Sequence, residues 1–223
     1  MARRFGHLAR LLNLTAPPAS PGAGDVWYRS DTDQFRGSDG LTGEQLTLGP
    51  YGTHPVVRST GWHSVPPTGN PASANILDQR LFAMPLWPGR TCTLTAIAAN
   101  VTTALIGTTL RMGIYTSDGV LPTTLLSDFG TVSSGVLGTA QISALSVSVR
   151  PVLHYLAFVR QGAVGTLAVS IRNTWDPIIA NASAVIAANR TAYYVDGVAG
   201  ALPASFGAPA GTDLGPALSV QLT

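Results

Sequence analysis

Short runs of alternating apolar and polar residues dominate the middle of this chain and predict β-strands. Leu110, Met112 and Ile114 share one face of such a run, and the residues between them face the other way. The stretch 116–119, Thr-Ser-Asp-Gly, has the composition of a tight turn. The same alternation returns over 145–149. Because no helical period occurs in this region, the pattern predicts paired, half-buried strands.

A second kind of run predicts a strand near the centre of the fold. Residues 153–159 are apolar at nearly every position, as expected of a strand covered on both faces. The run from Cys92 to Val101 changes phase between Ala96 and Ile97, which is typical of a β-bulge. The pattern therefore predicts an all-β fold, an antiparallel β-sandwich with a jelly-roll-like topology. Further strands are expected at 125–132, 167–171, 192–195 and 218–222, while 180–189 fits a strand or a short helix.

Proline and glycine divide the chain into four predicted parts. Residues 1–23 form an N-terminal docking segment that ends in a Pro-rich, extended connector. Residues 24–48 form a β-hairpin module, in which 26–29 and 34–36 are the strands. Residues 49–75 form a second extended connector, and 76–223 form the β-sandwich domain. Because one hairpin is barely stable alone, the module needs a neighbour.

The first residues have the spacing of a docking peptide. Apolar side chains recur over one short stretch, which suits an amphipathic helix that becomes ordered against a partner. The stretch is too short for the apolar core of a secretion signal, and Arg10 and Asn13 interrupt it. The candidate docking residues are Phe5, Leu8, Leu11 and Leu12.

Composition narrows the function classes. Only 11% of the residues are charged, all 13 basic residues are arginine, and the net charge is +2, so nucleic-acid binding is not expected. No apolar run is long enough to cross a membrane. The single cysteine, Cys92, lies in a predicted strand and is expected to be a small buried side chain. A surface so poor in charge is covered by Ser, Thr, Asn and Gln, or by other subunits.

Two stretches resemble proteins of tailed bacteriophages. The segment 24–40, with its Gly-Asp-Val-Trp-Tyr strand and Asp/Thr turn, is similar to a hairpin module of tail fibres and other appendage proteins. The stretches 80–86, 110–115 and 121–126 resemble the distal β-sandwich of minor tail and fibre proteins, where a Gly-Ile-Tyr strand precedes a Pro-containing loop. The resemblance covers about two thirds of the chain, but its motifs encode strands and turns. Long fibres also carry heptads and a shaft, which this sequence lacks.

The resemblance implies a structural protein of the virion, made in the host cytoplasm and located on the tail or the capsid surface. It implies a homotrimer whose N-terminus docks on other virion proteins and whose C-terminal domain takes part in host attachment and receptor binding. A capsid decoration or head-fibre protein is the alternative within the same class. A glycan-binding module is the alternative from the binding class.

The sequence has no arrangement typical of an enzyme or a metal site, and we expect no catalytic residues, no metal and no cofactor. No nucleophile elbow is present, and the carboxylates lie beside turn residues. Asp31, Asp33 and Asp39 lack the spacing of a calcium loop and suit a hairpin turn. The histidines are scattered, although a trimer could gather one from each chain around an axial ion. They are His7, His54, His63 and His154.

Aromatic residues supply the candidate binding chemistry. An aromatic face matches the apolar face of a sugar ring, so exposed Trp and Tyr side chains can hold a glycan. The same side chains also fill sandwich cores and subunit seams, and the sequence leaves both interpretations open. The candidates are Trp62, Trp87, Trp175, Tyr193 and Tyr194.

Overall fold

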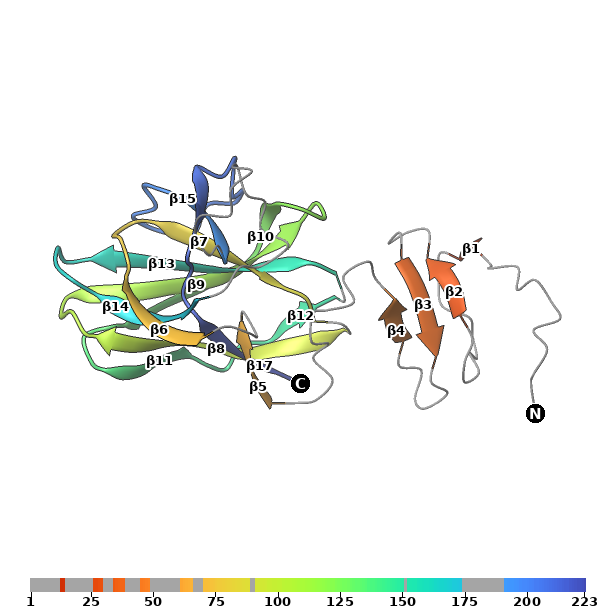
Figure 1. The fold of residues 1–223 in the computed structure, drawn as a ribbon, viewed down its shortest axis with the longest axis horizontal. Helices are drawn as coiled ribbons and strands as arrows, with labels where there is room; N and C mark the ends of the chain where they lie inside the picture. The colour runs from red at the N-terminus through yellow and green to blue at the C-terminus, as the bar shows by residue number, and fades with distance from the viewer. Residues whose placement is uncertain are drawn as a thin grey trace. The chain divides into compact units, whose positions relative to one another are not determined.

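The computed structural model describes residues 13–14, 26–29, 34–38, 45–48, 61–65, 70–88, 91–150, 152–173 and 191–223. The chain forms two compact units, which divide between Val56 and Val57 (Figure 1). All regular secondary structure in the described residues is β-strand. None of these residues belongs to a helix that could cross a membrane.

The first unit contains a small sheet in the order β1-β2-β3-β4. The predicted hairpin is confirmed, because β2 and β3 are antiparallel and Tyr28 pairs with Phe35. The return strand continues two residues beyond the predicted end, and β4 pairs with it in turn. Trp27 is buried within this unit. The strands are β1 (Asn13–Leu14), β2 (Val26–Arg29), β3 (Gln34–Ser38) and β4 (Gln45–Leu48).

The second unit is built from two antiparallel sheets, which we name sheet I and sheet II. Sheet I has the order β10-β9-β13-β7-β15-β16, and sheet II has the order β5-β17-β8-β14-β6, with β11 and β12 also paired with β8. Sheet I consists of β7 (Leu81–Leu86), β9 (Thr108–Ser117), β10 (Pro122–Ser133), β13 (His154–Gly162), β15 (Ala192–Val195) and β16 (Gly211–Asp213). Sheet II consists of β5 (Gly61–Val65), β6 (Asn70–Asn75), β8 (Cys92–Thr103), β11 (Gly138–Ile142), β12 (Val147–Val149), β14 (Ala168–Asn173) and β17 (Leu218–Leu222).

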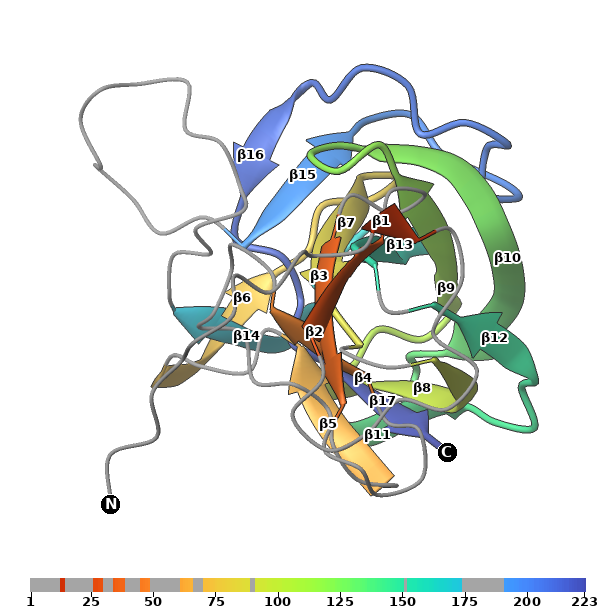
Figure 2. The ribbon, with the colours of Figure 1, turned by 90° about the vertical axis from the view of Figure 1, so that its right-hand side faces the viewer.

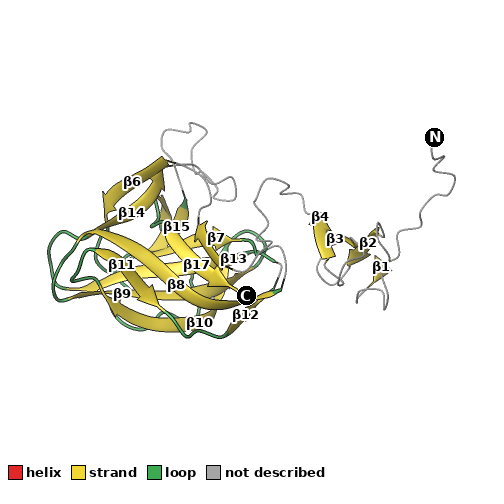
Figure 3. Ribbon diagram, turned by 90° about the horizontal axis from the view of Figure 1, so that it is seen from below, coloured by secondary structure: helices red, strands yellow, loops and turns green. Residues whose placement is uncertain are grey.

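The predicted sandwich is confirmed. From β7 to β17 the chain passes repeatedly between the two sheets, as in jelly-roll-like folds, and the sheets do not close into a barrel. Figure 3 views the molecule from the side of sheet II, where β8 runs between β11 and β17. In sheet I the edge strand β10 bends strongly around the sandwich (Figure 2), and its pairing with β9 contains register shifts of the kind that bulges produce.

The main core lies between the sheets and follows the predicted alternation. Leu110, Met112 and Ile114 of β9 are fully buried there, opposite the row Leu218, Val220 and Leu222 of β17. Because successive residues of a strand face opposite sides of its sheet, each of these two rows lies on the inner face of its own sheet. Strand β13 is buried along 154–161 and lies between β9 and β7, which confirms the strand expected near the centre.

A second core covers the outer face of sheet I. The segment 196–210 lies across that face and packs on Tyr115, Tyr155 and Tyr193. The Tyr115 ring meets Phe206 edge-on at a centroid distance of 5.5 Å, and its hydroxyl donates to the carbonyl of Pro203 at 2.8 Å. Burial, together with the charge of Asp128, raises the pKa of Tyr115. Sheet I is therefore covered on both faces, whereas the alternation alone suggested one polar face.

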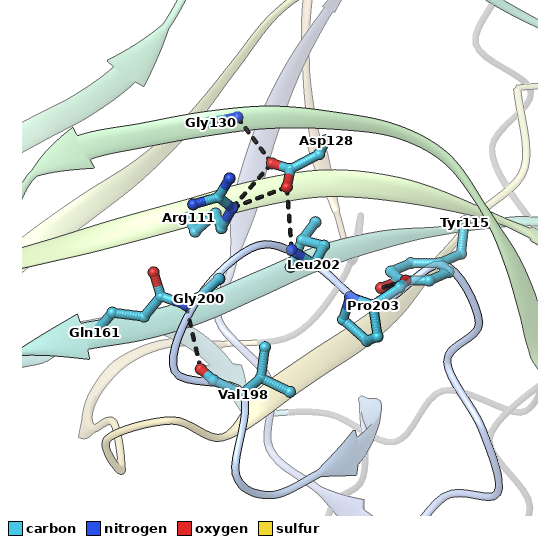
Figure 4. Close-up of polar contacts among 9 residues, drawn as sticks. All are labelled: Arg111, Tyr115, Asp128, Gly130, Gln161, Val198, Gly200, Leu202 and Pro203. Atoms are coloured by element: carbon cyan, nitrogen blue, oxygen red, sulfur yellow. Dashed lines mark hydrogen bonds and ion pairs between the residues drawn. The ribbon is translucent and has the colours of Figure 1, made fainter.

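Asp128 connects the 196–210 segment to sheet I (Figure 4). Its carboxylate accepts hydrogen bonds from Arg111 Nε at 2.8 Å, from Gly130 N at 2.9 Å and from Leu202 N at 3.0 Å. Burial raises the pKa of Asp128, but the hydrogen bonds from Gly130, Leu202 and Arg111 outweigh it, so the pKa lies below its usual value. One carboxylate thus fixes a loop that is distant in sequence.

The boundary predicted at residue 76 is too late. The segment 49–75 contains β5 and β6, which pair with β17 and β14 in sheet II. Pro, Ser and Asn weaken the strand pattern of these edge strands, so the sequence suggested a connector. The bulge predicted between Ala96 and Ile97 of β8 is present one residue earlier. Ala96 and Leu94 are two residues apart, yet they pair with the consecutive residues Gln221 and Leu222 of β17. Residues 180–189 lie outside the described residues.

The buried His154 makes the stability of the sandwich depend on pH. It lies in β13 on the face of Leu156 and Phe158, and its Nε2 atom has no hydrogen-bond partner among the described residues. Burial lowers the pKa of His154 from about 6.5 to about 4. The unfolded chain therefore binds more protons than the folded chain between these two values, and stability falls as the pH falls through that range.

We expect His154 alone to lower the free energy of unfolding by about 2 kcal/mol between pH 7 and pH 5. Urea unfolding of the wild type and of His154→Leu over this range checks the effect, because other groups contribute equally to both proteins. Parallel pH curves for the wild type and His154→Leu would contradict the assignment.

Candidate functional site

The outer face of sheet II is polar but uncharged over its centre. Ser219 and Gln221 of β17 face outward between the buried residues of that strand. In β8, Ala98 and Asn100 alternate with residues of the core; Asn100 is exposed and the small Ala98 is 5% exposed. In β11, Thr139 and Gln141 flank the buried Ala140. Strand pairing aligns these positions in rows, because Gln141 pairs with Ala98, Ala98 with Ser219, and Thr139 with Asn100.

Trp62 stands at one side of this face. It lies on the edge strand β5, pairs with Gln221, and is 46% exposed. A groove of about 330 Å³ runs from the indole across β17 and β8 to β11. We name it the sheet II groove. The residues that line it are Trp62, Ala98, Ala99, Asn100, Thr139, Gln141 and Ser219.

The groove combines one apolar wall with several hydrogen-bonding groups. Its described lining has no ionisable side chain, and Ala98 and Ser219 keep the floor low. Asn100 Nδ2 donates to Ser170 Oγ at 2.8 Å, which orients the amide. The amides of Asn100 and Gln141 can each donate and accept, as can the hydroxyls of Thr139 and Ser219. Such a site suits a neutral ligand with both an apolar face and hydroxyl groups.

The aromatic residues predicted from the sequence as glycan-binding candidates lie in different parts of the structure. Trp62 lies at the groove, whereas Tyr194 of β15 is half-buried against the main core and Trp87 against the second core. Tyr194 lies under the guanidinium of Arg80, 3.9 Å from its ring centroid. Tyr193 is buried in the second core, so its ring cannot stack on a sugar, and this part of the prediction is wrong. Trp175 lies outside the described residues.

Other candidate chemistry is limited in the described part of the chain. Groups of three or more His, Cys, Asp and Glu side chains able to hold a metal do not occur among the described residues. His63 lies in β5 and the buried His154 in β13, on different sheets. Cys92 is buried, as predicted. The residues proposed for docking (Phe5, Leu8, Leu11 and Leu12), the turn acids (Asp31, Asp33 and Asp39), His7 and His54 lie outside the described residues.

A second candidate surface lies at one end of the sandwich. Four aliphatic side chains in the loops 104–107, 134–137 and 163–167 are 65% to 98% exposed. The loops adjoin one another: Leu105 N donates to Ser134 O at 3.2 Å, and Ala163 N donates to Gly107 O at 3.1 Å. Exposed apolar clusters on a protein surface mark contacts with partners. We name this surface the apolar tip; it consists of Ile106, Val136, Leu137 and Val164.

The apolar tip is held by a buried hydroxyl pair and by a close backbone approach. Thr108 Oγ1 lies 2.6 Å from Leu105 O and 2.6 Å from Ser134 Oγ. Gly162 has a φ of +117°, and a Cβ there would lie 2.4 Å from Gly107 O. These contacts join all three loops at their base, so the tip is a built surface rather than a set of independent loops.

The tip and the start of β5 lie at opposite ends of the sandwich. Strand β8 begins at Cys92, beside Thr223, and ends at Thr103, where the first tip loop follows. Gly61, the first residue of β5, pairs with Leu222 near the Cys92 end. The 12 residues of β8 span roughly 35 Å. The chain therefore enters the sandwich at the end away from the apolar tip.

Sequence patterns missed the groove and the tip for different reasons. The groove residues other than Trp62 are small or polar and come from three separate strands. The tip does have a local signal, because Ile106-Gly107, Gly135-Val136-Leu137-Gly138 and Val164-Gly165 place aliphatic residues beside glycines, where turns are expected. An aliphatic residue in a turn has no core to enter, so it is a candidate for contact with a partner.

Comparisons with models of protein families, with curated proteins and with solved structures found no match to this chain.

Proposed function

We propose that this chain is a structural protein of a tailed-bacteriophage virion, a tail fibre or minor tail component that attaches the particle to its host. The N-terminal segment docks on other virion proteins, and the sandwich faces the host surface. The protein acts as a homotrimer and by binding rather than by catalysis. The proposal begins from the resemblance of 24–40 and of the sandwich strands to phage appendage proteins.

The observation that carries the proposal is the position of the apolar tip. A protein that docks by its N-terminus and binds with its C-terminal domain needs a contact surface away from the point where the chain enters that domain. Ile106, Val136, Leu137 and Val164 form such a surface, roughly 35 Å along β8 from its first residue. The low charge of the chain also suits a subunit that is largely covered by neighbours.

Labelling of intact particles tests the location. Antibodies raised against residues 57–223 should bind to the tail of the purified virion when viewed by electron microscopy. Labelling of the head would support the alternative, a capsid decoration or head-fibre protein. Absence of the protein from washed particles would overturn the virion assignment.

Substituting the apolar tip should weaken attachment. The change Ile106→Ser with Val164→Ser removes two of the four aliphatic side chains while leaving the hydroxyl pair at the base intact. We expect binding of the labelled protein to host cells to fall about tenfold, because buried aliphatic contacts are lost at the interface. Flow cytometry of host cells measures the change.

Val120→Ser is the matched control for the tip variant. Val120 is 54% exposed and lies in the turn before β10, at the other end of β9 from the tip loops. Its substitution should leave host binding unchanged. If the tip variant instead dissociates the oligomer, the tip is a seam between subunits. Equal host binding by the wild type and both variants would exclude the tip from attachment.

Native mass spectrometry at micromolar concentration tests the oligomer. We expect a trimer, because trimers place three equivalent binding domains at the end of an appendage. A compact monomer as the dominant species would overturn the proposed trimer.

A further inference from the structure

We propose that the sheet II groove binds one unit of an uncharged glycan, with the face of a pyranose ring against the indole of Trp62. This inference goes beyond the proposed function, because the groove is a surface separate from the apolar tip, and its biological role in host attachment rests on that function. The binding itself depends only on the groove.

Exposure of Trp62 is the first step of the argument. Large aromatic side chains normally lose their surface to a core, yet Trp62 stays 46% exposed on the edge strand β5. Val65 of the same strand and the inward row of the paired strand β17 belong to the core between the sheets, and Trp62 does not. A ligand that stacks on the indole would cover this apolar surface without any change in the fold.

The hydrogen-bonding groups lie across the groove from the indole. Thr139 and Gln141 reach it from β11, and Asn100 lies beside Thr139 on β8. Amide and hydroxyl groups both donate and accept, which matches the vicinal hydroxyls of a sugar. Ala98 and Ser219 form a floor of small side chains between the two walls, so the ring can lie on the strands.

Charge selects among the possible glycans. The described lining has no arginine, lysine or histidine to pair with a carboxylate, sulfate or phosphate, and no acid to pair with an amino sugar. Desolvating a charged group without a partner is costly, so sialylated, uronic and phosphorylated sugars are disfavoured. The volume of about 330 Å³ suits one or two sugar rings rather than a longer stretch of chain.

Calorimetry and NMR titration of the full-length protein test the inference. The probes are maltotriose, cellotriose and mannotriose as neutral glycans, with 3′-sialyllactose as the anionic comparator. We expect saturable binding of at least one neutral probe and weaker binding of 3′-sialyllactose. Trp62→Ala should weaken the neutral probe about tenfold or more, and Trp62→Phe should restore part of the affinity, because a smaller aromatic face remains.

Two further variants separate stacking from a general loss of surface. Gln141→Ala should weaken binding severalfold, because it removes hydrogen bonds to the sugar. Leu126→Ala is the matched control, since Leu126 is 42% exposed on β10 of sheet I, away from the groove. Its affinity should equal that of the wild type. Thermal unfolding of every variant confirms that the sandwich is intact.

The inference is overturned if no neutral probe binds at millimolar concentration, if Trp62→Ala binds as the wild type does, or if 3′-sialyllactose binds more tightly than the neutral glycans. Competition for the groove by an extended peptide but not by any sugar would also overturn it. If antibodies label the tail but no glycan binds, this inference is wrong and the proposed virion function stands. Glycan binding by a protein absent from particles would remove the virion function and leave the groove assignment standing.

Discussion

Replacing Gly162 with alanine is expected to lower the free energy of unfolding by about 3 kcal/mol. Gly162 ends β13 at a φ of +117°, which side chains other than hydrogen rarely allow. The added Cβ would also lie 2.4 Å from Gly107 O and 3.1 Å from Thr108 Cα, both of which are backbone atoms. Because neither strain nor clash can be relieved by a side-chain rotation, the loops must move apart. Urea unfolding measures the loss.

The consequence should extend from stability to the apolar tip. Gly107 and Thr108 hold the tip loops, so displacing them changes the positions of Ile106 and Val164. Gly162→Ala should therefore reduce host binding even at temperatures where the protein is folded. Gly200→Ala is the matched control, since a Cβ there meets nothing within 4 Å. If Gly162→Ala and Gly200→Ala lower the free energy of unfolding equally, the close backbone approach at Gly162 does not destabilise the alanine variant.

Replacing Asp128 with alanine should lower the free energy of unfolding by about 3 kcal/mol and release the 196–210 segment. The carboxylate receives hydrogen bonds from Arg111, Gly130 and Leu202, and its side chain is only 19% exposed. Alanine leaves the guanidinium half-buried without its acceptor and leaves two backbone donors unsatisfied. Chymotrypsin should then cleave near Leu202 and Phe206 faster than in the wild type.

Asp118→Ala is the control for this second substitution. Asp118 Oδ1 accepts hydrogen bonds from Val120 N and Leu121 N in the exposed turn before β10, and those bonds lower its pKa. Loss of these two hydrogen bonds should lower the free energy of unfolding by about 1 kcal/mol and leave the rate of cleavage at 196–210 unchanged. If Asp128→Ala leaves the cleavage rate at the wild-type value, the segment is held by its apolar contacts with Tyr115 and not by the carboxylate.

A tethered 196–210 segment also explains why sheet I presents no free face. Gln161 Nε2 donates to Gly200 O at 2.6 Å, and Leu125 N donates to Ala204 O at 2.9 Å, so backbone and side chains both anchor the segment. Among the described residues, the outer face of sheet II carries the exposed Trp62 beside polar side chains, whereas Trp87 is half-buried against the second core. The glycan site that we propose therefore lies on sheet II, whose outer face carries the groove.

Local sequence determined the central strands of the sandwich and their inward faces. Alternation set the buried rows of β9 and β17, and the unbroken apolar run set the central position of β13, because a strand side chain can face only two ways. It also placed the hairpin of the first unit and the turn at Asp118. Each of these features depends on neighbours within a few residues, where burial and turn geometry leave few alternatives.

Only the tertiary structure decided which surfaces remain open. Strand order brought Trp62, Asn100 and Gln141 together from β5, β8 and β11, although nearly eighty residues separate the first from the last. Strand pairing also placed the edge strands β5 and β6 within the expected connector 49–75, and the packing of the 196–210 segment buried Tyr193. Exposure of a side chain depends on what packs over it. The pattern of residues along one strand does not show which distant segments pack against it. The groove on sheet II could therefore be recognised only from the tertiary structure.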